Sequence, residues 1–97
     1  MAWRIEFVPA AAKDIKKLGK AEAARIIATL ESRIAVLEDP RKLGSALTGD
    51  LGGLWRWRIG DYRVIARIED ERITILVVRV AHRAKPIDKQ SQVSFTT

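Results

Sequence analysis

The chain has 97 residues, with 18 Lys and Arg against 12 Asp and Glu, a net charge of +6, one histidine and no cysteine. This length allows one domain built on one hydrophobic core and excludes a separate cofactor domain, while the basic balance favours a polyanionic partner such as nucleic acid or an acidic protein segment. Without cysteine there is no disulfide framework or thiolate nucleophile, and a single histidine does not make a structural zinc site, so we expect no metal or other cofactor.

The N-terminal residues predict a strand followed by a short helix. Residues 3–8 alternate apolar and charged side chains, as a half-buried strand does, and Pro9 ends the strand where it can also open a helix. Residues 10–18 place apolar side chains at helical spacing, and Gly19 supplies the left-handed conformation that commonly closes a helix.

A longer helix and a loop come next. Residues 21–37 carry an apolar stripe with charged residues outside it, and the stripe ends before Asp39-Pro40. The two successive helices therefore predict a helical hairpin. Residues 40–53 contain a proline and four glycines, and we expect them to form a loop that leads into a sheet.

Residues 54–68 predict two strands joined by a turn at Gly60-Asp61. Successive side chains of a strand point to opposite faces, so this segment has an apolar face and a basic face. The arginines expected on the basic face are Arg56, Arg58 and Arg63. The tryptophans of the segment have the opposite parity, which favours packing in the core over stacking on bases.

A last strand is predicted over residues 72–81, after a turn at Asp70-Glu71. Its apolar run at residues 75–78 indicates an inner strand that is covered on both faces. Strict alternation would put Ile65, Ile75 and Val77 on surface that the helices do not cover. It would also separate His82 from Arg83, unless a twist or bulge at Ala81 brought them to one cleft.

Taken together, the elements predict an α+β domain with the order β-α-α-β-β-β, over residues 1–97. A helical hairpin is expected on one face of a mainly antiparallel four-stranded sheet, with a short C-terminal segment and a loose tail at residues 88–97. The chain has no apolar run of membrane-spanning length and does not open like a signal peptide, so we expect it in the cytoplasm.

This order of elements, with two stretches of sequence, resembles the RelE/ParE superfamily of bacterial type II toxins. The first stretch is residues 54–65, Leu-Trp-Arg-Trp-Arg-Ile-Gly-Asp-Tyr-Arg-Val-Ile, which looks like the family's strand-turn-strand. The second is residues 80–83, Val-Ala-His-Arg, which looks like its segment after the last strand. In the RelE branch the resemblance implies a ribosome-dependent endoribonuclease that cuts mRNA through attack of a ribose 2′-hydroxyl on the adjacent phosphate.

The resemblance also implies which residues would do this work. The positions that match the family in charge are Arg56, Arg58, Arg63 and Arg83. We expect Arg58, Arg63 and Arg83 to be catalytic, together with His82 for its imidazole chemistry. Arg56 and Lys85, a lysine close to Arg83, are the expected RNA-binding residues. Arginine suits phosphate binding but is a poor proton acceptor, whereas an imidazole can act as acid or base near neutral pH. The chain lacks the stacking tyrosine that the branch commonly carries after the last strand, and it has Thr48-Gly49 where many members have a basic residue before the glycine.

Two alternatives to the nuclease stay open on the sequence alone. One is a ParE-like inhibitor of DNA gyrase, and the other is a catalytically weak toxin homologue that mainly binds its antitoxin. In each case the resemblance implies a cognate RelB-like antitoxin, acidic and partly disordered, in a hetero-oligomeric complex. The nuclease would also have the ribosome and mRNA as partners, and none of the three involves a membrane.

Overall fold

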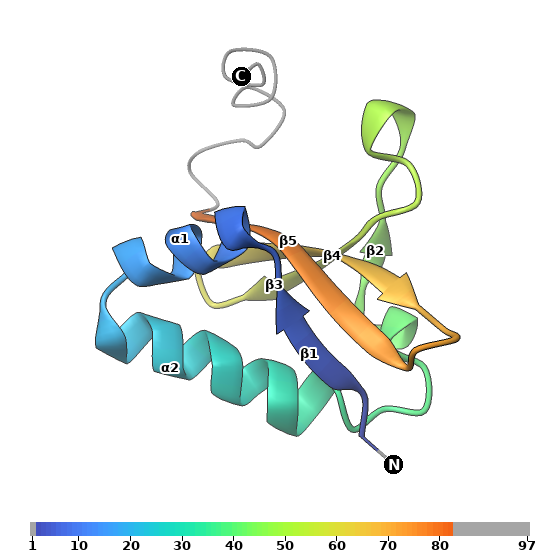
Figure 1. The fold of residues 1–97 in the computed structure, drawn as a ribbon, viewed down its shortest axis with the longest axis horizontal. Coiled ribbons are helices and arrows are strands. Elements are labelled where there is room, and N and C mark those ends of the chain that lie inside the picture. The colour runs from blue at the N-terminus through green and yellow to red at the C-terminus, as the bar shows by residue number, and fades with distance from the viewer. Residues whose placement is uncertain (1, 83–97) are drawn as a thin grey trace.

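Two helices cover one face of a five-stranded sheet in the computed structural model, which describes residues 2–82 (Figure 1). The strand order is β1-β5-β4-β3-β2, with β1 parallel to β5 and all other neighbours antiparallel. The α+β class and the helical hairpin on one face of a mainly antiparallel sheet are thus confirmed. The predicted strand count was one too low, because the two-residue strand β2 (Ser45–Ala46) lies within the expected loop.

The helical layer follows the first strand, β1 (Arg4–Phe7). Helix α1 (Pro9–Lys17) starts at the proline, and Gly19, with φ of 88°, separates it from α2 (Lys20–Thr29). The long helix expected to reach residue 37 continues only through a π-helical turn, η1 (Leu30–Ile34).

The helix ends after this π-helical turn, where the carbonyl of Ala35 accepts a hydrogen bond from outside the helix. The Ala35 N–H donates to the Leu30 carbonyl at 2.7 Å, and the Ala35 carbonyl accepts the Trp3 N–H, also at 2.7 Å. Leu30 and Ile34 are both buried. The end of the helical layer is thereby tied to the start of β1.

The main core lies between these helices and the sheet. Ile26 and Leu30 pack there against Trp57, Val64 and Val77, all of them buried. Burying an aliphatic side chain of this size contributes roughly 1.5–3 kcal/mol. The Trp57 indole N–H donates to the Pro40 carbonyl at 3.0 Å, so this tryptophan is a core residue, as its parity predicted.

Three strands form the middle of the sheet: β3 (Trp55–Ile59), β4 (Tyr62–Glu69) and β5 (Thr74–His82). Gly60, with φ of 59°, allows the tight turn between β3 and β4. Two short 3-10 turns, η2 (Pro40–Leu43) and η3 (Gly49–Leu51), flank β2 in the connection that precedes β3.

Strand β5 contains a bulge that the sequence pattern did not predict. Ala66 pairs with Val77 and Ile65 pairs with Arg79, so Val78 has no partner on β4. The extra residue reverses the alternation, and Val80 therefore joins Val77 in the core while Ala81 faces the other way. Strict alternation would have put Ala81 on the face of Val77, and the irregularity lies at Val78 rather than at Ala81.

Some expectations fall on parts of the chain that the structure does not describe. Arg83, Lys85 and the tail at residues 88–97 lie outside residues 2–82. Among the described helices, none combines the length and the apolar character that crossing a bilayer requires.

Candidate nucleic-acid interface

Among the arginines on the sheet face turned away from the helices are Arg56, Arg58 and Arg63, and we call the surface that these three form the arginine face. Arg58 pairs directly with Arg63 across β3 and β4, and Arg56 pairs with Ile65. Paired residues of neighbouring strands share a face, so the predicted gathering of the three cations is confirmed. The turn at Gly60 sets this register.

The arginines border an apolar patch on the same face. Ile65 and Ala81 are buried there, packed against Leu47, Leu54 and Val78. A hydrogen bond of 3.0 Å from the Leu47 N–H to the Leu54 carbonyl closes the loop that supplies two of these side chains.

The prediction that the helices leave three apolar residues of the sheet uncovered was therefore only partly correct. Ile65 does lie on the face away from the helices, whereas Ile75 and Val77 are fully buried on the helix side. The arginine face consequently adjoins the apolar cluster around Ile65.

The described residues do not neutralise the positive charge of these three arginines. Within the described part of the chain, no carboxylate forms an ion pair with Arg56, Arg58 or Arg63. The Nε atom of Arg63 is buried, and it has no hydrogen-bond acceptor among residues 2–82. A buried donor without an acceptor is costly unless a ligand supplies one, and a phosphate oxygen is a suitable acceptor for a guanidinium.

His82 lies on the other side of the sheet from these arginines. It pairs with Tyr62, whose ring it meets edge to face at a centroid distance of 5.3 Å, and Tyr62 packs against the helix-side core. The structure therefore does not bring His82 together with Arg58 and Arg63. Its catalytic role stays a prediction, as do the roles of Arg83 and Lys85, which lie outside the described residues.

The surroundings of His82 include an acid that the sequence reasoning missed. Asp14 on α1 lines a cleft of about 280 Å³ together with Lys17, Arg79 and His82. Its Oδ2 accepts hydrogen bonds from Arg79 Nε at 2.9 Å and from the Val80 N–H at 3.0 Å. No local signal marks this residue, because its partners lie 65 and 66 positions further along the chain.

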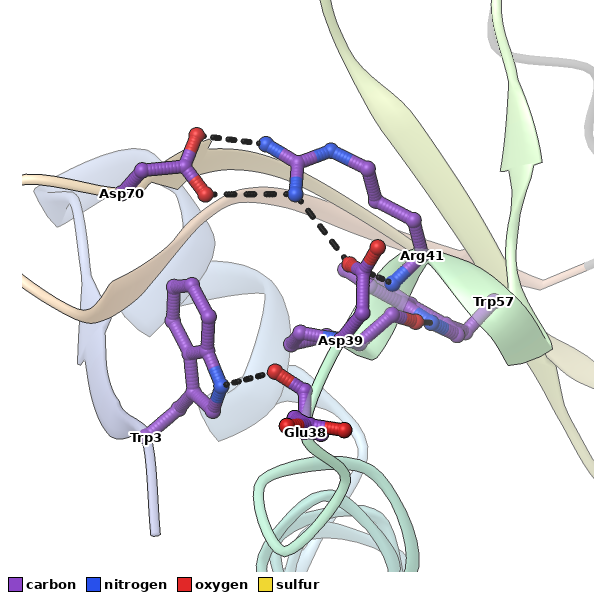
Figure 2. A network of polar contacts seen from close by, with 7 residues as sticks. Trp3, Glu38, Asp39, Arg41, Trp57 and Asp70 are labelled. Carbon is purple, nitrogen blue, oxygen red and sulfur yellow. Dashed lines mark hydrogen bonds and ion pairs between the residues drawn. The ribbon is translucent and has the colours of Figure 1, made fainter. Parts of the chain in front are cut away.

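A second polar network lies near the turn between β4 and β5 (Figure 2). Arg41 donates to both carboxylate oxygens of Asp70, at 3.2 and 2.7 Å, and also to Asp39 at 3.1 Å. The hydrogen bonds to Asp70 raise the pKa of Arg41 and, reciprocally, lower the pKa of Asp70. This network ties the 3-10 turn η2 to the β4–β5 turn. Among residues 2–82, no three carboxylate or histidine side chains gather closely enough to hold a metal ion.

Comparisons with known proteins identify a family model and two toxins that this chain resembles. A model of the ParE toxin of the parDE type II toxin-antitoxin system matches residues 5–87. Toxin RelG of Mycobacterium tuberculosis is 31% identical over 84 residues, which cover 87% of this chain and 94% of the relative. Toxin RelE of the same organism is 30% identical over 82 residues, which cover 84% of this chain and 82% of the relative.

Solved structures show the same architecture. The RelBE2 toxin-antitoxin complex of M. tuberculosis matches with a TM-score of 0.77 and 29% identity, over 88% of this chain and 95% of that one. The archaeal RelE-RelB complex from Pyrococcus horikoshii matches with a TM-score of 0.59 and 28% identity, over 89% of this chain and 100% of that one. The intact RelBE complex of E. coli shares the fold, with a TM-score of 0.63 and 23% identity over 84% of this chain and 96% of that one.

Proposed function

We propose that this chain, which belongs to the RelE/ParE toxin superfamily of type II toxin-antitoxin systems, inhibits translation by cutting mRNA on the ribosome. The observation that carries the proposal is the arginine face, where Arg58 and Arg63 oppose each other without a carboxylate partner among the described residues. Fixed cations in this arrangement suit the RNA backbone, since planar guanidinium groups bind phosphate oxygens in pairs. The named RelE and RelG relatives support the nuclease branch.

In the proposed reaction, the ribose 2′-oxygen forms a bond to the adjacent phosphorus, and the bond from phosphorus to the 5′-oxygen breaks. The proton of the 2′-hydroxyl passes to a base, and the departing 5′-oxygen takes a proton from an acid. Negative charge builds on the phosphate between these events, where Arg58 and Arg63 would stabilise it. Arg56, two positions before Arg58 on the same strand, would hold a neighbouring phosphate.

Proton transfer needs groups other than these arginines, because a guanidinium is a poor proton acceptor. Up to residue 67, the other positions of β3 and β4 on this face are Ile65 and Arg67, and neither can act as a base. A face without a base among these positions fits dependence on the ribosome, because holding the mRNA precisely raises the rate of cleavage through positioning alone. Arg83 and His82 stay candidates for the remaining roles, and Lys85 for a phosphate contact.

We also propose a RelB-like antitoxin as the cognate partner, in a hetero-oligomeric complex. The M. tuberculosis and P. horikoshii neighbours are complexes of RelE with RelB. An acidic antitoxin segment with apolar side chains would suit a surface where arginines border the apolar patch around Ile65. Binding there would cover the proposed cleavage site and so neutralise the toxin in the cytoplasm.

A ParE-like inhibitor of DNA gyrase is the second candidate, because the matching family model is that of ParE toxins. Primer extension on cellular mRNA after induction, beside a gyrase supercoiling assay with purified protein, separates the two. The nuclease predicts cuts within translated codons and normal supercoiling. Inhibited supercoiling with intact mRNA would select the gyrase inhibitor, and neither effect would leave a catalytically weak homologue that binds its antitoxin.

A further inference from the structure

A second surface feature lies at the far end of β4 from the arginine face. A cleft of about 570 Å³ is lined by Trp3, Val36, Glu38, Asp70 and Ile73, and we call it the acidic cleft. Arg63 stands near the start of β4 and Asp70 just past its end, which at the rise of a strand separates them by roughly 23 Å. Figure 1 shows the β4–β5 turn across the molecule from the β3–β4 turn.

Ile73 in this cleft has an unfavourable conformation for its residue type. Its φ is +49°, in the left-handed region that β-branched residues rarely adopt, and its side chain is 42% exposed. The backbone of the turn needs no isoleucine, because the bonds from the Ile73 N–H to Asp70 and from the Arg4 N–H to the Ile73 carbonyl use main-chain atoms only. Folding alone would favour glycine or asparagine here.

The neighbouring side chains extend this exposed apolar surface. Val36, from the other side of the cleft, is 55% exposed. The indole N–H of Trp3 donates to the Glu38 carbonyl at 3.3 Å, which holds the ring as a wall of the cleft (Figure 2). Three apolar side chains from separate segments therefore line one opening.

The rim of the cleft is acidic in a chain of net charge +6. The adjoining segments 3–6, 36–41 and 69–73 contain six of the twelve carboxylates and only three arginines. Each of these arginines already pairs with a carboxylate of the same segments. Glu38 and Glu71 have no ion-pair partner among the described residues, so the rim keeps a surplus of negative charge.

We propose that the acidic cleft docks a protein segment in which a large apolar side chain is flanked by lysine or arginine. The apolar side chain would bury Ile73 and Val36, while a basic neighbour would face Glu38 and the ring of Trp3. Nucleic acid is excluded as the occupant by the charge of the rim. The separation from the arginine face lets both surfaces be occupied at once, and the docking does not depend on RNA cleavage.

A titration followed by NMR tests this docking directly. The probe is a short synthetic peptide with a central leucine pair between lysines, and the control peptide carries glutamates in place of the lysines. We expect the lysine peptide to shift the Trp3 indole N–H and the methyl groups of Val36 and Ile73, and the glutamate peptide to leave them unmoved. Equal shifts with both peptides, or shifts confined to the arginine face, would overturn the proposal.

Two variants separate docking from folding. Ile73→Asn removes the apolar side chain at a position where asparagine tolerates positive φ, so we expect unchanged or higher thermal stability and at least about tenfold weaker peptide binding. Leu43→Asn is the matched control, since Leu43 is also exposed apolar surface, at 55%, outside the cleft, and should leave binding unchanged. Undiminished binding by Ile73→Asn would contradict the role of Ile73 in docking, and a lower melting temperature would show that Ile73 serves the fold instead.

Discussion

Arg58 and Arg63 are placed where they oppose folding rather than support it. They face each other across two antiparallel strands, and like charges in such a pair destabilise a sheet. The buried Nε of Arg63 adds the cost of a donor without an acceptor among the described residues. Residues that weaken the fold in this way are expected at binding sites, where a ligand provides the missing interaction.

Replacing Arg63 with glutamine should therefore stabilise the isolated toxin. We expect Arg63→Gln to raise the free energy of unfolding by about 0.5 kcal/mol at low salt, with a smaller gain at high salt as the repulsion is screened. Urea denaturation at two salt concentrations measures both effects. Arg67→Gln, on the same face of the same strand but opposite Leu76, is the control and should change little. A loss of stability in Arg63→Gln alone would contradict this view of the pair.

Asp70 makes the stability of the folded protein depend on pH. Its pKa is lowered by hydrogen bonds from Arg41, so the ionised form is stabilised in the folded state. This contribution is fully present above the unfolded pKa of about 4 and is lost as pH falls through the lower folded value.

We expect wild type to be more stable than Asp70→Asn at about pH 6, with the difference shrinking as pH falls below about 4. Thermal melts across this range measure the difference, with Glu71→Gln as a control on the adjacent residue. A difference that stayed constant down to about pH 2 would show that the carboxylate charge is not what stabilises the turn.

At the scale of elements, Asp14 joins helix α1 to the end of β5. Strand β1 ends at Phe7, which pairs with Val77, so among residues 2–82 no strand lies beside the edge of β5 beyond that point. The Asp14 carboxylate takes the place of a neighbouring strand by accepting the Val80 N–H, and its side chain is only 14% exposed. On this edge, a side chain of the helical layer thus holds β5 just before Arg83.

Asp14→Ala should cost about 2–3 kcal/mol in the free energy of unfolding, since it removes charge-assisted hydrogen bonds from a partly buried site. Chemical denaturation measures this loss, and amide hydrogen exchange should show faster exchange at Val80. Glu31→Ala, at an exposed helical position, serves as the control and should stay near wild type. If Val80 kept its protection in Asp14→Ala, the carboxylate would not be what holds the strand edge.

The elements also show where prediction from sequence stops. The helices and the three long strands follow from periodicity, because each repeats its pattern over several residues. The two residues of β2 are too few to show alternation, and they are a strand only because Ser45 pairs with Arg56. The bulge at Val78 likewise depends on the register with β4, which strand parity alone does not contain.

At the scale of the whole molecule, the charges divide into a basic sheet face and an acidic end. The three arginines of the arginine face were predictable, since alternation within β3 and β4 and a tight turn suffice to bring them together. The acidic cleft was not predictable, because its lining comes from the residue before β1, the segment after the helical layer and the β4–β5 turn. Such a site depends on the parallel pairing of β1 with β5, a contact between the two ends of the chain.

The central claim is that the arginine face cuts RNA. It is tested most directly by primer extension on a translated mRNA after induction of wild type, Arg63→Ala and the control Arg67→Ala, each shown to be folded. We expect cleavage within codons by wild type and Arg67→Ala, and a loss of about 10²–10³-fold in Arg63→Ala, the usual effect of removing one donor to a developing negative charge. Cleavage at the wild-type rate by folded Arg63→Ala would contradict the account.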